Sequence, residues 1–153
     1  MDAMTRKLTR ALWIGAAGAA LLLAGCSTVN PYVPNWMGGD RVSVSLSGSE
    51  EVPPVSVVGT GSGHISVSKE GDVSGSITTT DVAGIAAHIH IGAKGRNGPV
   101  IIPLKKTDPN TWVVPEGAKL TESQLAAYKK GDLYVNVHTA AHKGGEVRAQ
   151  IVP

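Results

Sequence analysis

Apolar and polar residues alternate along most of the chain from residue 41 onward, and this two-residue period is typical of β-strands that bury one face. The clearest run is 41–47, in which Val42, Val44 and Leu46 are separated by serines. Similar short runs, divided by glycine and proline, cover 61–68, 73–79, 86–91, 100–104, 112–114, 132–139 and 146–152. The pattern predicts an all-β domain of about seven or eight strands, folded as an antiparallel β-sandwich or a flattened Greek-key barrel.

One segment departs from this alternation. Thr121 stands three residues before Gln124, the spacing of a capping box, and the segment closes with two lysines and Gly131. These signals predict a single short helix over 121–130.

The chain begins with a pattern typical of a bacterial lipoprotein leader. Three basic residues precede an apolar run at 11–23, which ends in Leu23-Ala24-Gly25-Cys26. The run is too short to cross a bilayer comfortably, and small residues before a cysteine are what lipoprotein processing recognises. We expect a signal peptide over 1–25 and acylation of Cys26, with cleavage that leaves a free thiol as the alternative. The expected location is the cell envelope, lipid-anchored to the outer membrane and facing the periplasm.

Residues 26–40 are rich in proline, asparagine and glycine, as an extended spacer would be. We expect the lipidated cysteine and a tether there, followed by one domain over 41–153. Trp36 and Met37 are apolar enough to pack on that domain instead, so the boundary is soft.

The charge balance narrows the partners. Residues 1–25 hold three of the 14 basic and one of the 12 acidic side chains, so the rest of the chain carries eleven of each. A neutral chain without a basic cluster argues against nucleic acid as a partner, because phosphate binding needs a concentrated positive surface.

Three histidines fall on outward positions of two predicted strands. His88 and His90 leave one face of the strand at 86–91 while its isoleucines leave the other, and His138 lies on the polar face of the strand at 132–139. If the two strands are neighbours, the three imidazoles converge without loss of buried apolar surface. Neutral imidazoles suit divalent first-row metals. The pattern predicts a metal site that favours copper as Cu(II), with zinc as the alternative.

Five more residues are candidates for this site. His142, in the loop after the second strand, and His64, in another strand, are candidate additional ligands. Asn136, Glu146 and Arg148 share the predicted polar wall and are expected to support the ligands without binding the ion. A carboxylate such as Glu146 can accept the second imidazole proton, and Arg148 would attract an anion to an open position. Histidines that merely occupy the solvated face of a sheet are the alternative.

Several separated motifs follow one another along the chain. They are Leu46-Ser47-Gly48-Ser49-Glu50-Glu51-Val52-Pro53-Pro54, Ala87-His88-Ile89-His90, Asn97-Gly98-Pro99-Val100, Leu133-Tyr134-Val135-Asn136-Val137-His138-Thr139 and Gly144-Gly145-Glu146-Val147-Arg148-Ala149-Gln150-Ile151. Their combination, over about residues 41–152, resembles the CHRD domain family, named for its occurrence in chordin. The resemblance implies an all-β domain found in bacterial exported proteins and animal chordins, with no general enzymatic activity. His64 does not fall on a motif position of the family. Six residues do: Glu51, His88, His90, His138, Glu146 and Arg148.

A fainter resemblance is to the copper-zinc superoxide dismutases, which also have a His-x-His strand, a later histidine near the C-terminus and an arginine after it. This chain lacks their long zinc-binding loop, and its single cysteine, Cys26, cannot form their disulfide. The missing zinc subsite argues against dismutase chemistry and remains compatible with a copper-like site.

Together these observations favour a membrane-tethered, non-enzymatic protein that binds copper for storage, delivery or resistance. One alternative is a protein- or surface-interaction module with structural histidines, whose stability would not respond to metal. The other is a superoxide dismutase-like redox enzyme, in which Arg148 steers a small anion to an open copper position.

Overall fold

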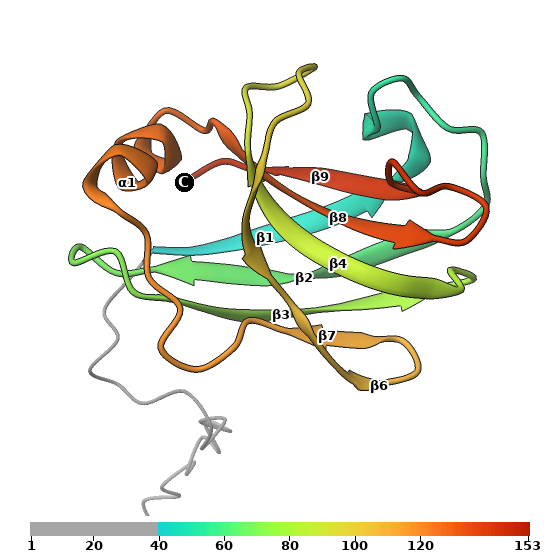
Figure 1. The fold of residues 1–153 in the computed structure, drawn as a ribbon, viewed down its shortest axis with the longest axis horizontal. Coiled ribbons are helices and arrows are strands. Elements are labelled where there is room, and N and C mark those ends of the chain that lie inside the picture. Colours follow the sequence, from blue (N-terminus) through green and yellow to red (C-terminus); the bar gives the residue numbers. More distant parts are fainter. Residues whose placement is uncertain (1–39) are drawn as a thin grey trace, which may run out of the picture. The chain divides into compact units, whose positions relative to one another are not determined.

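The computed structural model describes residues 40–153, and the expected signal peptide, Cys26 and nearly all of the tether lie outside this part of the chain. The described residues form nine strands, one 3₁₀ turn and one α-helix (Figure 1). They are β1 (Asp40–Ser47), η1 (Gly48–Glu50), β2 (Thr60–Val67), β3 (Val73–Thr80), β4 (Gly84–Ile91), β5 (Val100–Pro103), β6 (Lys105–Asp108), β7 (Thr111–Val113), α1 (Glu122–Lys129), β8 (Leu133–Thr139) and β9 (Val147–Ile151). No helix in residues 40–153 has both the length and the apolar character needed to span a bilayer.

All strand pairs are antiparallel and belong to one sheet, in the order β5-β4-β8-β9-β1-β2-β3-β7-β6. Its two end strands, β5 and β6, are consecutive in the chain and separated only by Leu104. The segment 100–108 therefore pairs with β4 through its first half and with β7 through its second half. The amide of Leu104 continues the ladder by donating to the carbonyl of Ala87 at 2.9 Å. The sheet is nearly closed, and the predicted all-β, barrel-like fold is confirmed (Figure 1).

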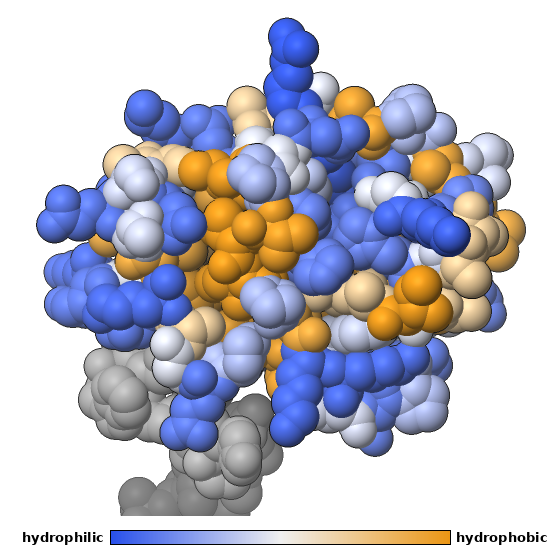
Figure 2. Space-filling model, in the orientation of Figure 1, coloured by the Kyte–Doolittle hydropathy of each residue, from blue (hydrophilic) through white to orange (hydrophobic). Residues whose placement is uncertain are grey.

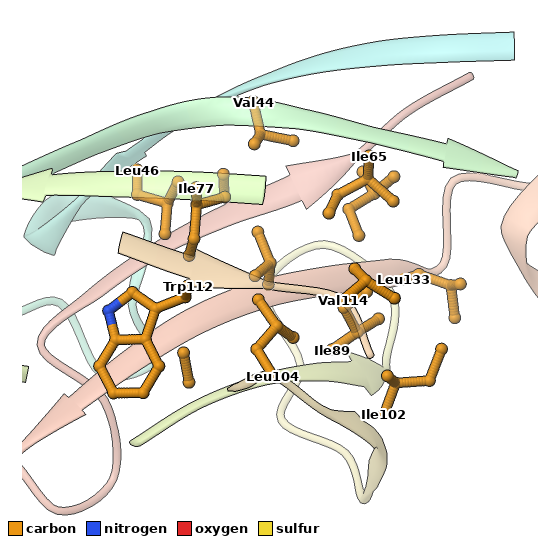
Figure 3. Packing of buried hydrophobic residues seen from close by; sticks show 14 of the residues in the cluster. Val44, Leu46, Ile65, Ile77, Ile89, Ile102, Leu104, Trp112, Val114 and Leu133 are labelled. Atoms are coloured by element: carbon orange, nitrogen blue, oxygen red, sulfur yellow. The ribbon is translucent and has the colours of Figure 1, made fainter. Parts of the chain in front are cut away.

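The interior is filled from the two opposite walls of this sheet. Val44, Leu46 and Ile65 point inward from β1 and β2, towards Ile89 of β4 and Leu133 of β8 (Figure 3). All five side chains are buried, and burying each contributes roughly 1.5–3 kcal/mol. The alternation in the sequence thus fixes which face of each strand turns inward, and the histidines of β4 and β8 must turn outward.

The predicted helix is confirmed as α1. The side chain of Thr121 accepts from the amide of Gln124 at 3.3 Å, and the side chain of Gln124 accepts from the amide of Thr121 at 2.9 Å, which completes the capping box. Tyr128 and the preceding Leu120 are buried in the core cluster. Figure 2 shows an apolar strip near the middle of the viewed face, with polar side chains around it.

The strand β6 was not predicted from the sequence. Its four residues, Lys-Lys-Thr-Asp, are all exposed, so no apolar alternation marks it. It forms because it continues β5 past Leu104 and pairs with β7, which is a tertiary cause and not a local one.

Candidate metal centre

The histidine cluster is built by the pairing of β4 with β8. These strands are neighbours, and their register places His88 opposite Asn136, His90 opposite Tyr134, and Ala86 opposite His138. The three imidazoles therefore lie on the same outer face, as strand parity predicts. One ligand nitrogen from each of His88, His90 and His138 lies within 4.8 Å of the other two.

The spacing within the cluster suits a common ion. Ring centroids are 4.8 Å apart for His88 and His138, 5.6 Å for His88 and His90, and 6.0 Å for His90 and His138. Nδ1 of His88 and Nε2 of His138 are 3.0 Å apart. Two imidazole nitrogens, each bound about 2.0–2.1 Å from one ion at a tetrahedral or square angle, are separated by roughly 3 Å as well. Metal binding would therefore need little movement of these two rings.

Backbone carbonyls fix the orientation of two of the rings. Nδ1 of His90 donates to the carbonyl of Gly98 at 2.9 Å, and Nδ1 of His138 donates to the carbonyl of Lys143 at 2.9 Å. A carbonyl only accepts, so in the neutral imidazole the Nε2 atom of each ring carries a lone pair. Nε2 of His138 accepts from His88, whereas Nε2 of His90 is buried and has no partner among residues 40–153. An outer hydrogen bond that leaves the second nitrogen free is the usual support of a metal-binding histidine.

Burial lowers the pKa of two of the three imidazoles. The pKa of His88 is lowered by desolvation first and then by the neighbouring His138 and His90. Desolvation also lowers the pKa of His90, against a smaller upward effect of the Gly98 carbonyl. Metal binding requires the neutral imidazole, so a lowered pKa favours it over proton binding near neutral pH.

Tyr134 and Arg148 form a layered support beneath His90. The Tyr134 ring stacks on His90 with ring centroids 4.7 Å apart and an interplanar angle of 6°. The Cζ atom of the Arg148 guanidinium lies 3.4 Å from the centroid of the Tyr134 ring. Arg148 is 1% exposed and donates to Oδ1 of Asn97 at 3.0 Å and to the carbonyl of Arg96 at 2.9 Å. It therefore holds the loop that carries the carbonyl partner of His90. The guanidinium is thus buried and hydrogen-bonded within the protein, which does not fit the expectation that it attracts an anion.

A second buried polar group adjoins the cluster. Glu51 and Asn136 are 4% and 2% exposed. A side chain at Gly145 would collide with the carboxylate of Glu51 and the amide of Asn136, and Gly145 has a φ of +136°. Desolvation raises the pKa of Glu51, and the positive charge of Arg148 opposes this shift. Glu51 had no assigned role in the sequence analysis; its place in the family motif was the available signal.

The remaining candidates lie elsewhere. The Oε2 atom of Glu146 accepts from the hydroxyl of Thr139 at 2.6 Å and not from a histidine. The carbonyls of Gly98 and Lys143 orient His90 and His138, a role that was expected of the Glu146 carboxylate. His142 is outside the three-histidine group, although its backbone bonds Thr139. His64 lies on β2 between Ser43 and Ser76 and is also outside the group.

Comparison with known protein families settles the affiliation. The family model of the CHRD domain matches residues 42–151. The chain belongs to the CHRD family. This match confirms the resemblance seen in the sequence and spans the strands from β1 to β9, so the whole cluster lies within the CHRD domain. Neither the curated proteins nor the solved structures gave a significant match.

The three histidines of this CHRD domain have the arrangement that a metal ion requires. Three imidazole nitrogens converge, two of them oriented by carbonyls, and one lone pair is buried and unused. Such a donor set is compatible with a divalent transition-metal ion held by three protein ligands.

Proposed function

We propose that this CHRD domain binds one copper ion through His88, His90 and His138. The observation that carries the proposal is the buried Nε2 of His90, a free lone pair with no hydrogen-bond partner, beside two imidazole nitrogens 3.0 Å apart. A buried acceptor without a partner is costly, and an ion at this point satisfies it. The carbonyl hydrogen bonds already hold His90 and His138 in place, so binding loses little side-chain entropy at these two ligands.

The choice of copper follows from the donors. Residues 40–153 contain no cysteine and no methionine, so thiolate and thioether ligands, which favour Cu(I), are missing from this part of the chain. Among divalent first-row metals, sites of nitrogen ligands bind Cu(II) most tightly, and Zn(II) is the next choice for a histidine triad. Zinc is the alternative ion.

The place and purpose of the site complete the proposal. The leader pattern ending in Cys26 supports a lipid-anchored protein of the cell envelope, on the outer membrane and facing the periplasm. There the protein would store, deliver or sequester copper. Two imidazoles oriented by carbonyls, a third beside them and an arginine that is 1% exposed favour binding over redox catalysis.

Calorimetric titration of the purified protein with Cu(II) and with Zn(II) tests the proposal. We expect uptake of about one Cu(II) ion, with tighter binding than Zn(II), as the order of metal affinities requires. The double variant His88→Ala with His90→Ala should abolish uptake. His64→Ala is the matched control, because it removes a half-buried histidine on another strand, and it should bind as the natural protein does. Equal copper uptake by the double variant and the natural protein would contradict the site.

A further inference from the structure

Asn136 occupies the centre of the histidine cluster. It lies in the middle of β8, directly opposite His88, and two residues before His138 on the same face. It is 2% exposed, so its amide is shielded from solvent. His90 lies on the same face, one pair further along the ladder from the His88–Asn136 pair.

The amide of Asn136 is held in one orientation. Its Nδ2 donates to the carbonyl of Gly144 at 3.4 Å and interacts with the carboxylate of Glu51. The backbone of Gly145 packs against this same end of the amide. Because the oxygen of a planar amide points away from its nitrogen, Oδ1 is turned away from the Glu51 carboxylate.

Among residues 40–153, three buried acceptors in and beside this cluster have no hydrogen-bond partner. They are Oδ1 of Asn136, Nε2 of His90, whose Nδ1 donates to Gly98, and Oε1 of the neighbouring Glu51. An amide oxygen and an imidazole lone pair cannot bond each other, because neither carries a proton to donate. A cation bound between them satisfies both at once.

We propose that Asn136 supplies its amide oxygen as the fourth protein donor to the metal ion, with Glu51 and the 144–145 backbone fixing the amide. This inference rests on the proposed function, because it assigns one more ligand to the same ion. The site then offers three imidazole nitrogens and one oxygen. An oxygen donor favours Cu(II) and Zn(II) over Cu(I). The amide that was expected only to support the ligands becomes one of them.

Variants of Asn136 provide the first test. Asn136→Leu keeps the approximate size and removes both polar atoms, and Asn136→Asp restores an oxygen at the same place. The exposed Asn110, in the turn between β6 and β7, provides the matched control Asn110→Leu. Each purified variant is titrated with Cu(II) against a competing chelator, and its electron paramagnetic resonance spectrum is recorded.

We expect Asn136→Leu to bind one Cu(II) ion with affinity lowered by about 10- to 100-fold or more, since even residues behind the ligands have effects of that size. Its copper hyperfine splitting should change. Asn136→Asp should retain tight binding, and Asn110→Leu should match the natural protein in both readouts. Unchanged affinity and an unchanged spectrum in Asn136→Leu would overturn the assignment while the histidine site stands. Failure of the natural protein to bind copper would instead reject the proposed function.

A second measurement needs no variant and therefore does not depend on the folding of Asn136→Leu. In the natural protein labelled with ¹³C and ¹⁵N, the side-chain carbonyl resonance of Asn136 is followed during titration with Zn(II), which is diamagnetic. Coordination through oxygen should move this resonance downfield in proportion to zinc bound, while that of Asn110 stays in place. A stationary Asn136 carbonyl at full zinc occupancy would overturn the assignment.

Discussion

The outer face of β1, β2 and β3 and the outer face of β4, β8 and β9 are made by the same alternation and have opposite characters. The first carries serine, threonine and His64, and its side chains are exposed or half-buried. The second carries Tyr134, Asn136 and Arg148, which are buried at 1–2% exposure although they point away from the core. The pattern of apolar residues alone does not separate these two faces.

The difference lies in what covers each face. Over β8 and β9, three loops supply contacts: the segment with Glu51, the 92–99 loop and the 140–145 loop. They bring backbone carbonyls to the imidazoles of His90 and His138. His64 has no such partner and sits among serines on its strand and its neighbours. His90 and His138 therefore differ from His64 in having a loop carbonyl that holds one ring nitrogen and leaves the other for a metal ion.

Removing the arginine beneath the site should have the largest effect. Arg148→Ala deletes a fully buried side chain that contacts the Tyr134 ring and donates to Asn97 and Arg96, and truncation of a large buried side chain to alanine costs about 2–5 kcal/mol. Arg41→Ala, on the exposed face of β1, should change the free energy of unfolding by less than about 0.5 kcal/mol. Urea denaturation measures both. Similar losses for the two arginines would erase the contrast between the faces.

Metal should stabilise the protein through the histidines on the outer face of β4 and β8, and not through His64 on β2. Free Cu(II) at 100 times its dissociation constant raises the free energy of unfolding by about 2.7 kcal/mol, which corresponds to roughly 10 °C in melting temperature for a domain of this size. We expect His90→Ala to lose this shift and His64→Ala to keep it. Thermal unfolding with and without copper provides the measurement. A melting temperature indifferent to metal would favour the interaction-module alternative.

Two adjacent glycines in the loop between β8 and β9, Gly144 and Gly145, should respond differently to the same substitution. Gly145→Ala places a methyl group against Glu51 and Asn136 at a φ of +136°, and such strain costs on the order of 1–3 kcal/mol. At Gly144 the added carbon would meet open space, so Gly144→Ala should be nearly neutral. Chemical denaturation of the two variants checks the difference. Equal stability of the variants would show that the loop does not pack on Glu51 in solution.

The smallest predicted effect concerns pH and Glu51. Burial raises the pKa of this carboxyl, so in the window above its ordinary value of 4.5 the folded protein still holds a proton that the unfolded chain has released. The contribution of Glu51 to stability is therefore largest below that window and declines as the pH rises through it. Melting temperatures of the metal-free natural protein and Glu51→Gln, compared from pH 4 to pH 7, should diverge in this sense. Parallel profiles would contradict the raised pKa.

The sequence predicted the part of the site that depends on strand parity. His88, His90 and His138 alternate with the buried aliphatic residues of β4 and β8, and adjacency of these strands was enough to bring the rings together. The helix at Thr121 was predictable as well, because a capping box is a local signal.

The parts that could not be predicted depend on distant contacts. The carbonyls of Gly98 and Lys143 are backbone groups, and no residue type marks them as partners of a histidine. The expectation that Glu146 orients a ring followed from its position on β9 and could not show that Thr139 engages it. The burial of Glu51 arises because a segment far from the histidines in sequence folds over them.

The change of partner at Leu104, where the segment 100–108 stops pairing with β4 and begins to pair with β7, affects recognition by other chains. Open sheets can be extended by another chain that adds a strand to unpaired main-chain groups. Within residues 40–153 the end strands of the sheet are the two halves of this segment, each only four residues long, so little unpaired main chain is left for such pairing. Recognition of a partner must then depend on side chains and loop shape. Neighbouring copies of the domain offer each other little unpaired main chain, so fibre formation through strand pairing is disfavoured even at high concentration.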